Sequence, residues 1–165
     1  MIRFEAVPTD APSLRRVYSC FPSGVTAVCA LVSGVPVGMA ASSFTSVSIT
    51  PPLVSVCMQD SSSTWPILRD RPRLGICILA ADQDEACAHL SRKGGDRFAR
   101  LAWEAGPGGG VFVCGATAWL DCSVHRQVRA GDHAIVVLKI HGLHAEVEAK
   151  PLIFHGSRFR RLSAI

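Results

Sequence analysis

The sequence predicts a mainly β protein whose antiparallel strands form a closed or partly closed barrel, with a few short helices beside it. Several segments are rich in valine, isoleucine and small residues, a composition typical of strands. Glycine, proline and serine lie between them, which favours hairpin connections and therefore antiparallel pairing. A barrel is expected because closure removes the exposed edges that many short strands would otherwise leave.

The elements are expected in a definite order along the chain. A helix is predicted over 11–18, because Asp10 is a capping residue, Pro12 comes early, and Leu14, Val17 and Tyr18 recur at helical spacing. Strands are predicted over 24–32, 35–39, 53–58, 74–79, 111–124 and 133–147. Two further short helices are expected, around 63–69 and over 84–92. Turns are expected at Ser33-Gly34-Val35-Pro36, Pro51-Pro52, Gly106-Pro107-Gly108-Gly109-Gly110 and Ala130-Gly131-Asp132, and several of them are expected to be hairpin connections.

Length and composition predict one globular domain covering residues 1–165. Apolar residues make up 48% and charged residues 18%, which excludes a disordered chain. The net charge of +4 suits an anionic ligand. Nucleic acid is not expected as a partner, because the basic residues are mostly scattered. The exceptions are Arg92, Lys93, Arg97 and Arg100 in one segment, and Arg158, Arg160 and Arg161 in another.

The seven cysteines lie mostly in apolar runs and form no C-x-x-C pair. They are therefore expected to be reduced, buried thiols, and no zinc or other metal site is expected. The charged residues near the N-terminus do not resemble a signal peptide, and no apolar run is long enough to cross a membrane. We therefore expect a cytoplasmic protein that does not contact membranes.

Two hydroxyl-rich segments are the strongest candidates for a binding site. They are Ala40-Ala41-Ser42-Ser43-Phe44-Thr45-Ser46-Val47-Ser48 and Ser61-Ser62-Ser63-Thr64-Trp65-Pro66. The second precedes a predicted helix, where hydroxyls and free backbone N–H groups favour a phosphate. Such runs are also common at ordinary strand edges. No G-x-G-x-x-G or P-loop motif is present, so a Rossmann or P-loop nucleotide site is not supported.

Read in order, several motifs resemble the flavin reductase-like family, whose members have an FMN-binding split-barrel fold. They are Phe21-Pro22-Ser23-Gly24-Val25-Thr26, the 38–48 segment, Pro51-Pro52-Leu53-Val54, Gly95-Asp96-Arg97-Phe98-Ala99, Gly115-Ala116-Thr117-Ala118-Trp119-Leu120-Asp121-Cys122, Gly131-Asp132-His133 and Phe154-His155-Gly156-Ser157-Arg158-Phe159-Arg160. The resemblance implies an antiparallel Greek-key split barrel that forms a homodimer. It also implies a flavin, FMN or FAD, bound near the subunit interface.

The resemblance also implies roles for particular residues. Met39, Ala40, Ala41, Ser42 and Ser43 would line the flavin ring. Ser61, Ser62, Ser63 and Thr64, next to Trp65, would hold the phosphate with Lys93 and Arg97. His133 would lie beside the nicotinamide. Phe98 and Phe159 are expected either near the ligands or in the core. The chain departs from the family in having Ala40, where threonine is common, and in a shorter segment over 90–95.

The implied activity is transfer of a hydride from NADH or NADPH to FMN, FAD or riboflavin, chemistry that belongs to the two cofactors. The reduced flavin would diffuse to a partner monooxygenase. Two alternatives remain at this point: an oxidase or oxygenase on the same barrel that retains its flavin, and a flavin carrier or redox sensor without turnover. The Gly131-Asp132-His133 turn favours catalysis over the carrier.

Overall fold

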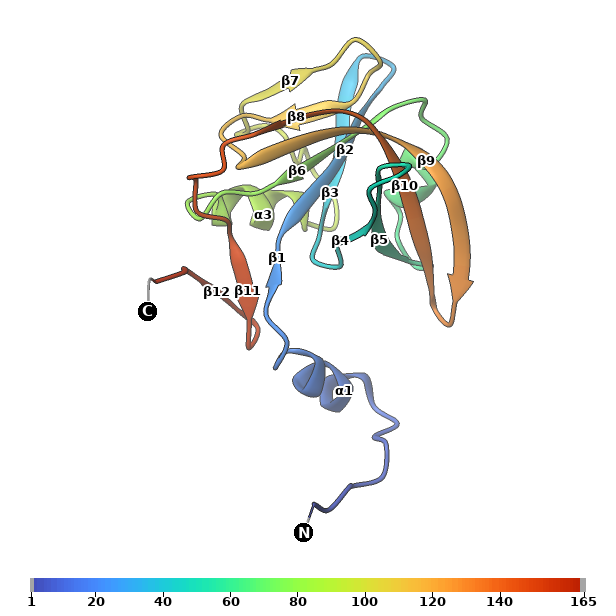
Figure 1. Cartoon of the computed structure of the whole chain (residues 1–165), viewed down its shortest axis with the longest axis vertical. Coiled ribbons are helices and arrows are strands. Elements are labelled where there is room, and N and C mark those ends of the chain that lie inside the picture. Colours follow the sequence, from blue (N-terminus) through green and yellow to red (C-terminus); the bar gives the residue numbers. More distant parts are fainter. Residues whose placement is uncertain (1, 164–165) are drawn as a thin grey trace.

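The computed structural model describes residues 2–163, and its largest element is a seven-stranded antiparallel sheet (Figure 1). The strand order is β3-β2-β6-β9-β10-β5-β4. The strands are β2 (Thr26–Val32), β3 (Val35–Ala41), β4 (Thr45–Ser48), β5 (Leu53–Gln59), β6 (Leu74–Ile78), β9 (Ala118–Ala130) and β10 (His133–Ala145). The predicted mainly β, antiparallel fold is therefore confirmed.

The seven-stranded sheet curls into a barrel because its two edge strands are neighbours in the sequence. Only residues 42–44 separate β3 from β4, so the first and last strands of the sheet must lie near each other. Ser43 fastens this junction to β5, since the backbone N–H of Cys57 donates to Ser43 Oγ at 2.8 Å. The barrel is split between β3 and β4, where strand pairing is interrupted.

Two smaller sheets and three helices accompany the barrel. The order β1-β11-β12 describes one sheet, and β7 pairs with β8 in the other. These strands are β1 (Ser23–Gly24), β7 (Trp103–Ala105), β8 (Val111–Val113), β11 (Ile153–His155) and β12 (Arg158–Arg160). The helices are α1 (Ala11–Tyr18), α2 (Trp65–Leu68) and α3 (Asp84–Leu90). All three predicted helices are present, although α2 and α3 are shorter than expected.

The four turn segments named in the sequence all join paired antiparallel strands, but two predicted strands are divided. Ser33 and Gly34 have positive φ angles between β2 and β3, and Gly131 does between β9 and β10. The prediction of one strand over 24–32 is wrong, because Val25 separates β1 from β2, which belong to different sheets. The prediction of one strand over 111–124 is also wrong. β8 ends at Val113 and β9 begins at Ala118, because Gly115 has a φ of 78° and turns the chain between them.

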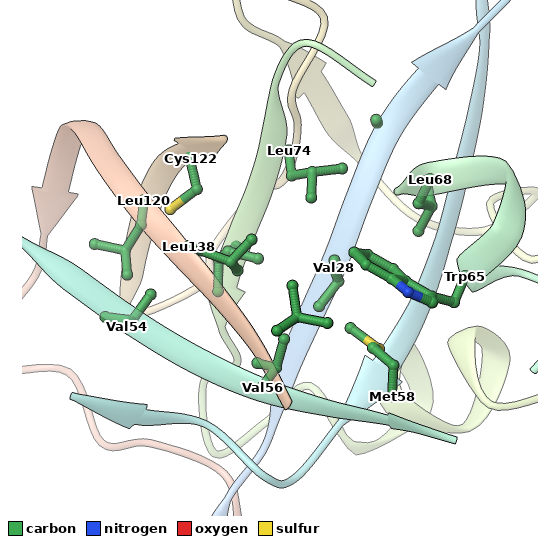
Figure 2. Close-up of a cluster of buried hydrophobic side chains, with 13 residues drawn as sticks. Val28, Val54, Val56, Met58, Trp65, Leu68, Leu74, Leu120, Cys122 and Leu138 are labelled. Carbon is green, nitrogen blue, oxygen red and sulfur yellow. The ribbon is translucent and has the colours of Figure 1, made fainter. Parts of the chain in front are cut away.

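Two layers of buried side chains account for the long apolar runs in the sequence. Alternate residues of a strand point to opposite faces, and both faces of β2 and β6 are covered. Val28 of β2 and Leu74 of β6 point into the barrel, together with Met58, Trp65 and Leu138 (Figure 2). The intervening Ala27, Cys29 and Cys77 pack outside it, in a second cluster with residues of α3 and β8.

The N-terminal segment lies outside both clusters. Helix α1 has no buried residue, and Figure 1 shows it beneath the barrel, near the sheet formed by β1, β11 and β12. Asp10 caps it by accepting a hydrogen bond from the backbone N–H of Ser13 at 2.8 Å. Beyond the helix, the N–H of Gly156 donates to the carbonyl of Ser19 at 3.0 Å, which ties this segment to the β11–β12 turn. Across residues 2–163, the helices are too short to span a bilayer.

Candidate ligand-binding groove

Two adjoining cavities lie along strand β3. The larger, here called the polar cavity, has a volume of about 900 Å³. Its lining residues are Arg15, Met39, Ala40, Gln59, Ser61, Ser62, Ser63, Thr64, Leu90, Ser91, Lys93, Gly94 and Arg97. The smaller, the apolar cavity, has a volume of about 290 Å³ and is lined by Val25, Ala40, Ala41, Ser42, Cys87, Ala88, Ser91, Phe154 and Phe159. Ala40 and Ser91 line both, so the two cavities form one groove between β3 and α3.

The polar cavity is built to receive an anion. Three basic residues and no acidic residue are among its lining side chains. Arg97 is held in place, because its Nη1 donates to the carbonyl of Gly38 at 2.8 Å and to Thr64 Oγ1 at 2.9 Å. Hydroxyls from the loop after β5 face the same space. Charge-assisted hydrogen bonds from such a set are typical of phosphate sites.

Helix α2 contributes less to this site than the sequence suggested. It spans only Trp65–Leu68, a single turn, so little dipole accumulates along it. Its first backbone donor is also occupied, since the N–H of Trp65 donates to Ser62 Oγ at 3.1 Å. The hydroxyls and the basic side chains therefore make the cavity favourable for an anion, and the helix start does not.

The apolar cavity fits a flat aromatic ring system. Ala40 and Ala41 present only methyl groups, which leaves room above β3. Within the described residues, β3 is an edge strand, so one side of its backbone lacks a strand partner and can bond to a polar ring edge. Phe159 closes the far wall with Phe154, at a ring separation of 5.7 Å and an interplanar angle of 63°. A ring in the apolar cavity could therefore extend an anionic tail into the polar cavity.

The structure brings most of the predicted binding residues together in this groove. Those that line it are Met39, Ala40, Ala41, Ser42, Ser61, Ser62, Ser63, Thr64, Lys93, Arg97 and Phe159. Ser43, Trp65 and Phe98 do not. Ser43 is bonded to Cys57, and Trp65 lies in the barrel core with its indole N–H donating to Gln127 Oε1 at 3.3 Å. Phe98 is 6% exposed and packs edge-on against Trp103. Of the two positions expected for Phe98, near the ligands or in the core, the structure shows the core.

His133 stands at the rim of the groove and is not among its lining residues. It begins β10 directly opposite Gln59, which does line the polar cavity. Its Nδ1 lies 2.7 Å from Asp132 Oδ1. This hydrogen bond is the main cause that lowers the pKa of Asp132, so the carboxyl group is ionised at neutral pH. An ionised carboxylate can only accept, so Nδ1 carries the proton and Nε2 is left free for a second hydrogen bond.

Sequence reasoning missed several residues of the groove. Gln59 directly follows the strand predicted over 53–58, so its position could have been inferred from that strand end. Ser91 lies inside the helix predicted over 84–92, whereas α3 ends at Leu90 and Ser91 follows it. Arg15 gave no signal, because nothing in the sequence brings helix α1 to the 59–64 loop. The others are Val25, Cys87, Ala88, Leu90, Gly94 and Phe154.

The cysteines are free thiols, and within residues 2–163 no group of three or more His, Cys, Asp or Glu side chains is placed to hold a metal ion. Burial raises the pKa of Cys77 and of Cys122 to about 12. Cys87 lines the apolar cavity, and burial raises the pKa of its thiol as well. Thiolate chemistry in the groove is therefore disfavoured at neutral pH.

Comparison with known proteins identifies the family of this chain. An NADH-dependent FAD reductase of Streptomyces globisporus is 37% identical over 94% of this chain and 88% of its own. The reductase subunit of a flavin-dependent monooxygenase from Rhodococcus jostii is 31% identical over 91% and 77%. A solved NADH:FAD oxidoreductase of S. globisporus, in complex with NAD and FAD fragments, superposes with a TM-score of 0.91 at 35% identity, covering 98% of both chains. The family model described as "Flavin reductase like domain" matches residues 18–163, and the chain therefore belongs to the flavin reductase-like family.

Proposed function

We propose that this flavin reductase binds its flavin along the groove beside β3, with the ring in the apolar cavity and the phosphate in the polar cavity. The observation that carries the proposal is the continuity of the two cavities through Ala40 and Ser91. A methyl-lined space thereby adjoins a space with three basic side chains, which matches a flavin ring and its anionic tail. NADH or NADPH would supply the electrons.

A bound flavin supplies the hydride acceptor, and the chain's own residues hold and orient the reactants. Lys93 and Arg97 neutralise the phosphate, and the hydroxyls of Ser61 to Thr64 add hydrogen bonds. The free backbone edge of β3 holds the polar edge of the ring. His133, with Nε2 free for a hydrogen bond, binds the nicotinamide carboxamide. Positioning of this kind can supply several kcal/mol of the barrier reduction without a general acid or base.

Release of the reduced flavin to a partner monooxygenase is the expected purpose of the reaction. The Rhodococcus jostii relative is named as the reductase subunit of such a monooxygenase. Four charged hydrogen bonds of about 1.5 to 3 kcal/mol each would give roughly 6 to 12 kcal/mol before the costs of association. Micromolar binding needs about 8 kcal/mol net, so a flavin that binds and leaves is consistent with this site.

A homodimer is part of the proposal. Val17, Tyr18 and Phe21 are 63%, 67% and 78% exposed, and lie together at the end of α1 and just beyond it. A second copy of the chain would remove this apolar surface from water, and large exposed apolar patches commonly mark such interfaces. We also place the protein in the cytoplasm, where its free cysteines would stay reduced.

The deciding experiment measures oxidation of NADH and of NADPH by the pure protein with FMN, FAD or riboflavin in excess. Turnover of excess free flavin supports a reductase that releases its product. Oxidation that stops after one equivalent of bound flavin would instead indicate an enzyme that retains it, and no oxidation with any flavin would reject the reductase.

Two substitutions, each of which removes one positive charge, test where the phosphate binds. Lys93→Gln should raise the KM for FMN about three- to tenfold and leave that for riboflavin, which has no phosphate, unchanged. Arg92→Gln removes the neighbouring positive charge, which does not line the cavity, and is the matched control. Equal effects of the two substitutions, or an equal effect of Lys93→Gln on riboflavin, would reject this placement.

A further inference from the structure

Arg15 forms part of the wall of the polar cavity, although the helix that carries it is exposed. Helix α1 has no buried residue, yet Arg15 lines the same space as Gln59, Ser61 and Arg97. It also precedes residue 18, where the match to the family model begins. Arg15 is therefore a cation of the groove that the family match does not include.

The basic groups of the polar cavity come from separate parts of the chain, Arg15 from α1 and Lys93 and Arg97 from the segment after α3. Arg97 is hydrogen-bonded to Gly38 and Thr64. These bonds fix it beside the end of the loop formed by residues 61–64, here called the hydroxyl loop. Arg15 lies toward Asp132: the pKa of Asp132 is lowered mainly by His133, and Arg15 adds a smaller contribution. The Asp132 turn adjoins the start of the hydroxyl loop, because the N–H of Asp60 donates to the carbonyl of Asp132 at 2.9 Å. The hydroxyls therefore line the same space as the guanidinium groups of Arg15 and Arg97.

Arg15 is available to a ligand. Among residues 2–163, no carboxylate lies within ion-pair distance of its guanidinium group, and the side chain of Asp132 is already bonded to His133. No acidic side chain is among the residues that line the polar cavity. A single phosphate would be met by Lys93, Arg97 and the hydroxyls, which leaves the Arg15 guanidinium group without a direct ion-pair partner in the cavity.

We propose that Arg15 binds the pyrophosphate of a dinucleotide substrate. The inference rests on the proposed function, because it assumes that the groove receives flavin and nicotinamide nucleotides. A pyrophosphate carries two anionic groups and is longer than a monophosphate, so it suits a cavity of about 900 Å³ that three cations line. A guanidinium group suits this role, since its planar donors can bond to two phosphate oxygens at once. The pyrophosphate belongs either to FAD or to NADH.

The experiment compares each dinucleotide with the mononucleotide that lacks the second phosphate. In one arm, kcat/KM is measured for FAD and for FMN at fixed NADH. In the other, it is measured for NADH and for reduced nicotinamide mononucleotide at fixed FMN. Arg15→Gln should lower the dinucleotide-to-mononucleotide ratio about tenfold in one arm, and that arm identifies the source of the pyrophosphate. Arg15→Lys should restore part of the ratio, and Arg16→Gln, which neutralises the adjacent cation outside the cavity, should leave both ratios unchanged.

Unchanged ratios in both arms, or equal losses for mononucleotide and dinucleotide, would overturn the role of Arg15. Failure of the proposed function would look different, because the unsubstituted protein would then oxidise neither nicotinamide with any flavin. In that event the same ratios are measured as dissociation constants, from flavin and nicotinamide fluorescence. A weaker preference of Arg15→Gln for FAD over FMN, or for NADH over reduced nicotinamide mononucleotide, would still support the inference. If the unsubstituted protein bound dinucleotide and mononucleotide equally well, the inference would be overturned.

Discussion

The carboxylate of Asp132 holds the imidazole of His133 through a hydrogen bond of 2.7 Å between Oδ1 and Nδ1. The two residues are consecutive, and Gly131, with a φ of 64°, forms the turn that lets both side chains lie on the same side. Their side chains are 83% and 40% exposed, so the bond contributes mainly orientation and little stability. Because the nicotinamide is proposed to meet His133, Asp132 is a positioning residue for that contact.

Loss of this bond should slow flavin reduction without preventing it. In Asp132→Asn the amide can donate to or accept from Nδ1, so the imidazole is no longer restricted to one tautomer. We expect the rate of flavin reduction by NADH to fall about tenfold, as substitutions that release an orienting partner commonly do. Stopped-flow absorbance of the flavin gives this rate directly, and flavin affinity should stay within about twofold.

A double substitution separates positioning from a general loss of charge. His133→Ala removes the group that Asp132 orients, so adding Asp132→Asn to it should cause no further loss of rate. Asp70→Asn, which neutralises an exposed carboxylate paired with Arg69, is the charge control and should leave the rate unchanged. Additive losses in the double variant would show that Asp132 acts independently of His133.

Ala40 is the residue at which a new hydrogen bond to the flavin can be added. It lies where the two cavities meet, on an edge strand that tolerates a β-branched side chain. Ala40→Thr should tighten FMN binding about two- to tenfold, the range expected for one net hydrogen bond. Ala40→Val has the same shape without the hydroxyl and should not tighten binding. Flavin fluorescence titration measures both, and equal affinities in the two variants would contradict a hydroxyl contact.

The regular elements and much of the groove could be predicted because their signals are local. Asp10 and Pro12 mark the start of α1, and the hydroxyl loop after β5 is visible as a run of serines. The order of the motifs then indicated the family, and the resemblance to that family implied which residues line the flavin site. Those assignments agree with the lining of the groove at β3 and in the 61–64 loop.

What the sequence did not show depends on contacts between distant segments. Arg15 reaches the polar cavity from a helix that is remote in sequence from the 59–64 loop, so no spacing pattern could reveal it. Trp65 is next to the hydroxyls in sequence, but it begins helix α2, whose buried side chains Trp65 and Leu68 pack into the barrel core. The short strands β7, β11 and β12 lack apolar alternation long enough to detect.

Gly75 should be indispensable to the fold. A methyl group at this position would overlap the carbonyl oxygen of Val111, so strand β8 could not pack over β6. The clash would be with backbone atoms of Val111, which cannot move without disturbing the second cluster of buried side chains. Gly75→Ala should therefore destabilise the protein by about 3 kcal/mol or more, measured by urea unfolding. Gly24→Ala, where a methyl group meets nothing within 4 Å, is the control and should change stability by less than about 1 kcal/mol.

The buried thiols make stability sensitive to alkaline pH. Burial raises the pKa of Cys77 and of Cys122 from the ordinary value of 9.0 to about 12. A group whose pKa is raised by folding stabilises the folded state fully below its unfolded pKa, and this contribution is lost as pH rises toward the folded pKa. The thermal midpoint should therefore fall between about pH 9 and 12, and less steeply in Cys77→Ala. The exposed Cys57→Ala is the control and should keep the full slope. Equal slopes in both variants would show that ionisation of Cys77 does not contribute to unfolding at high pH.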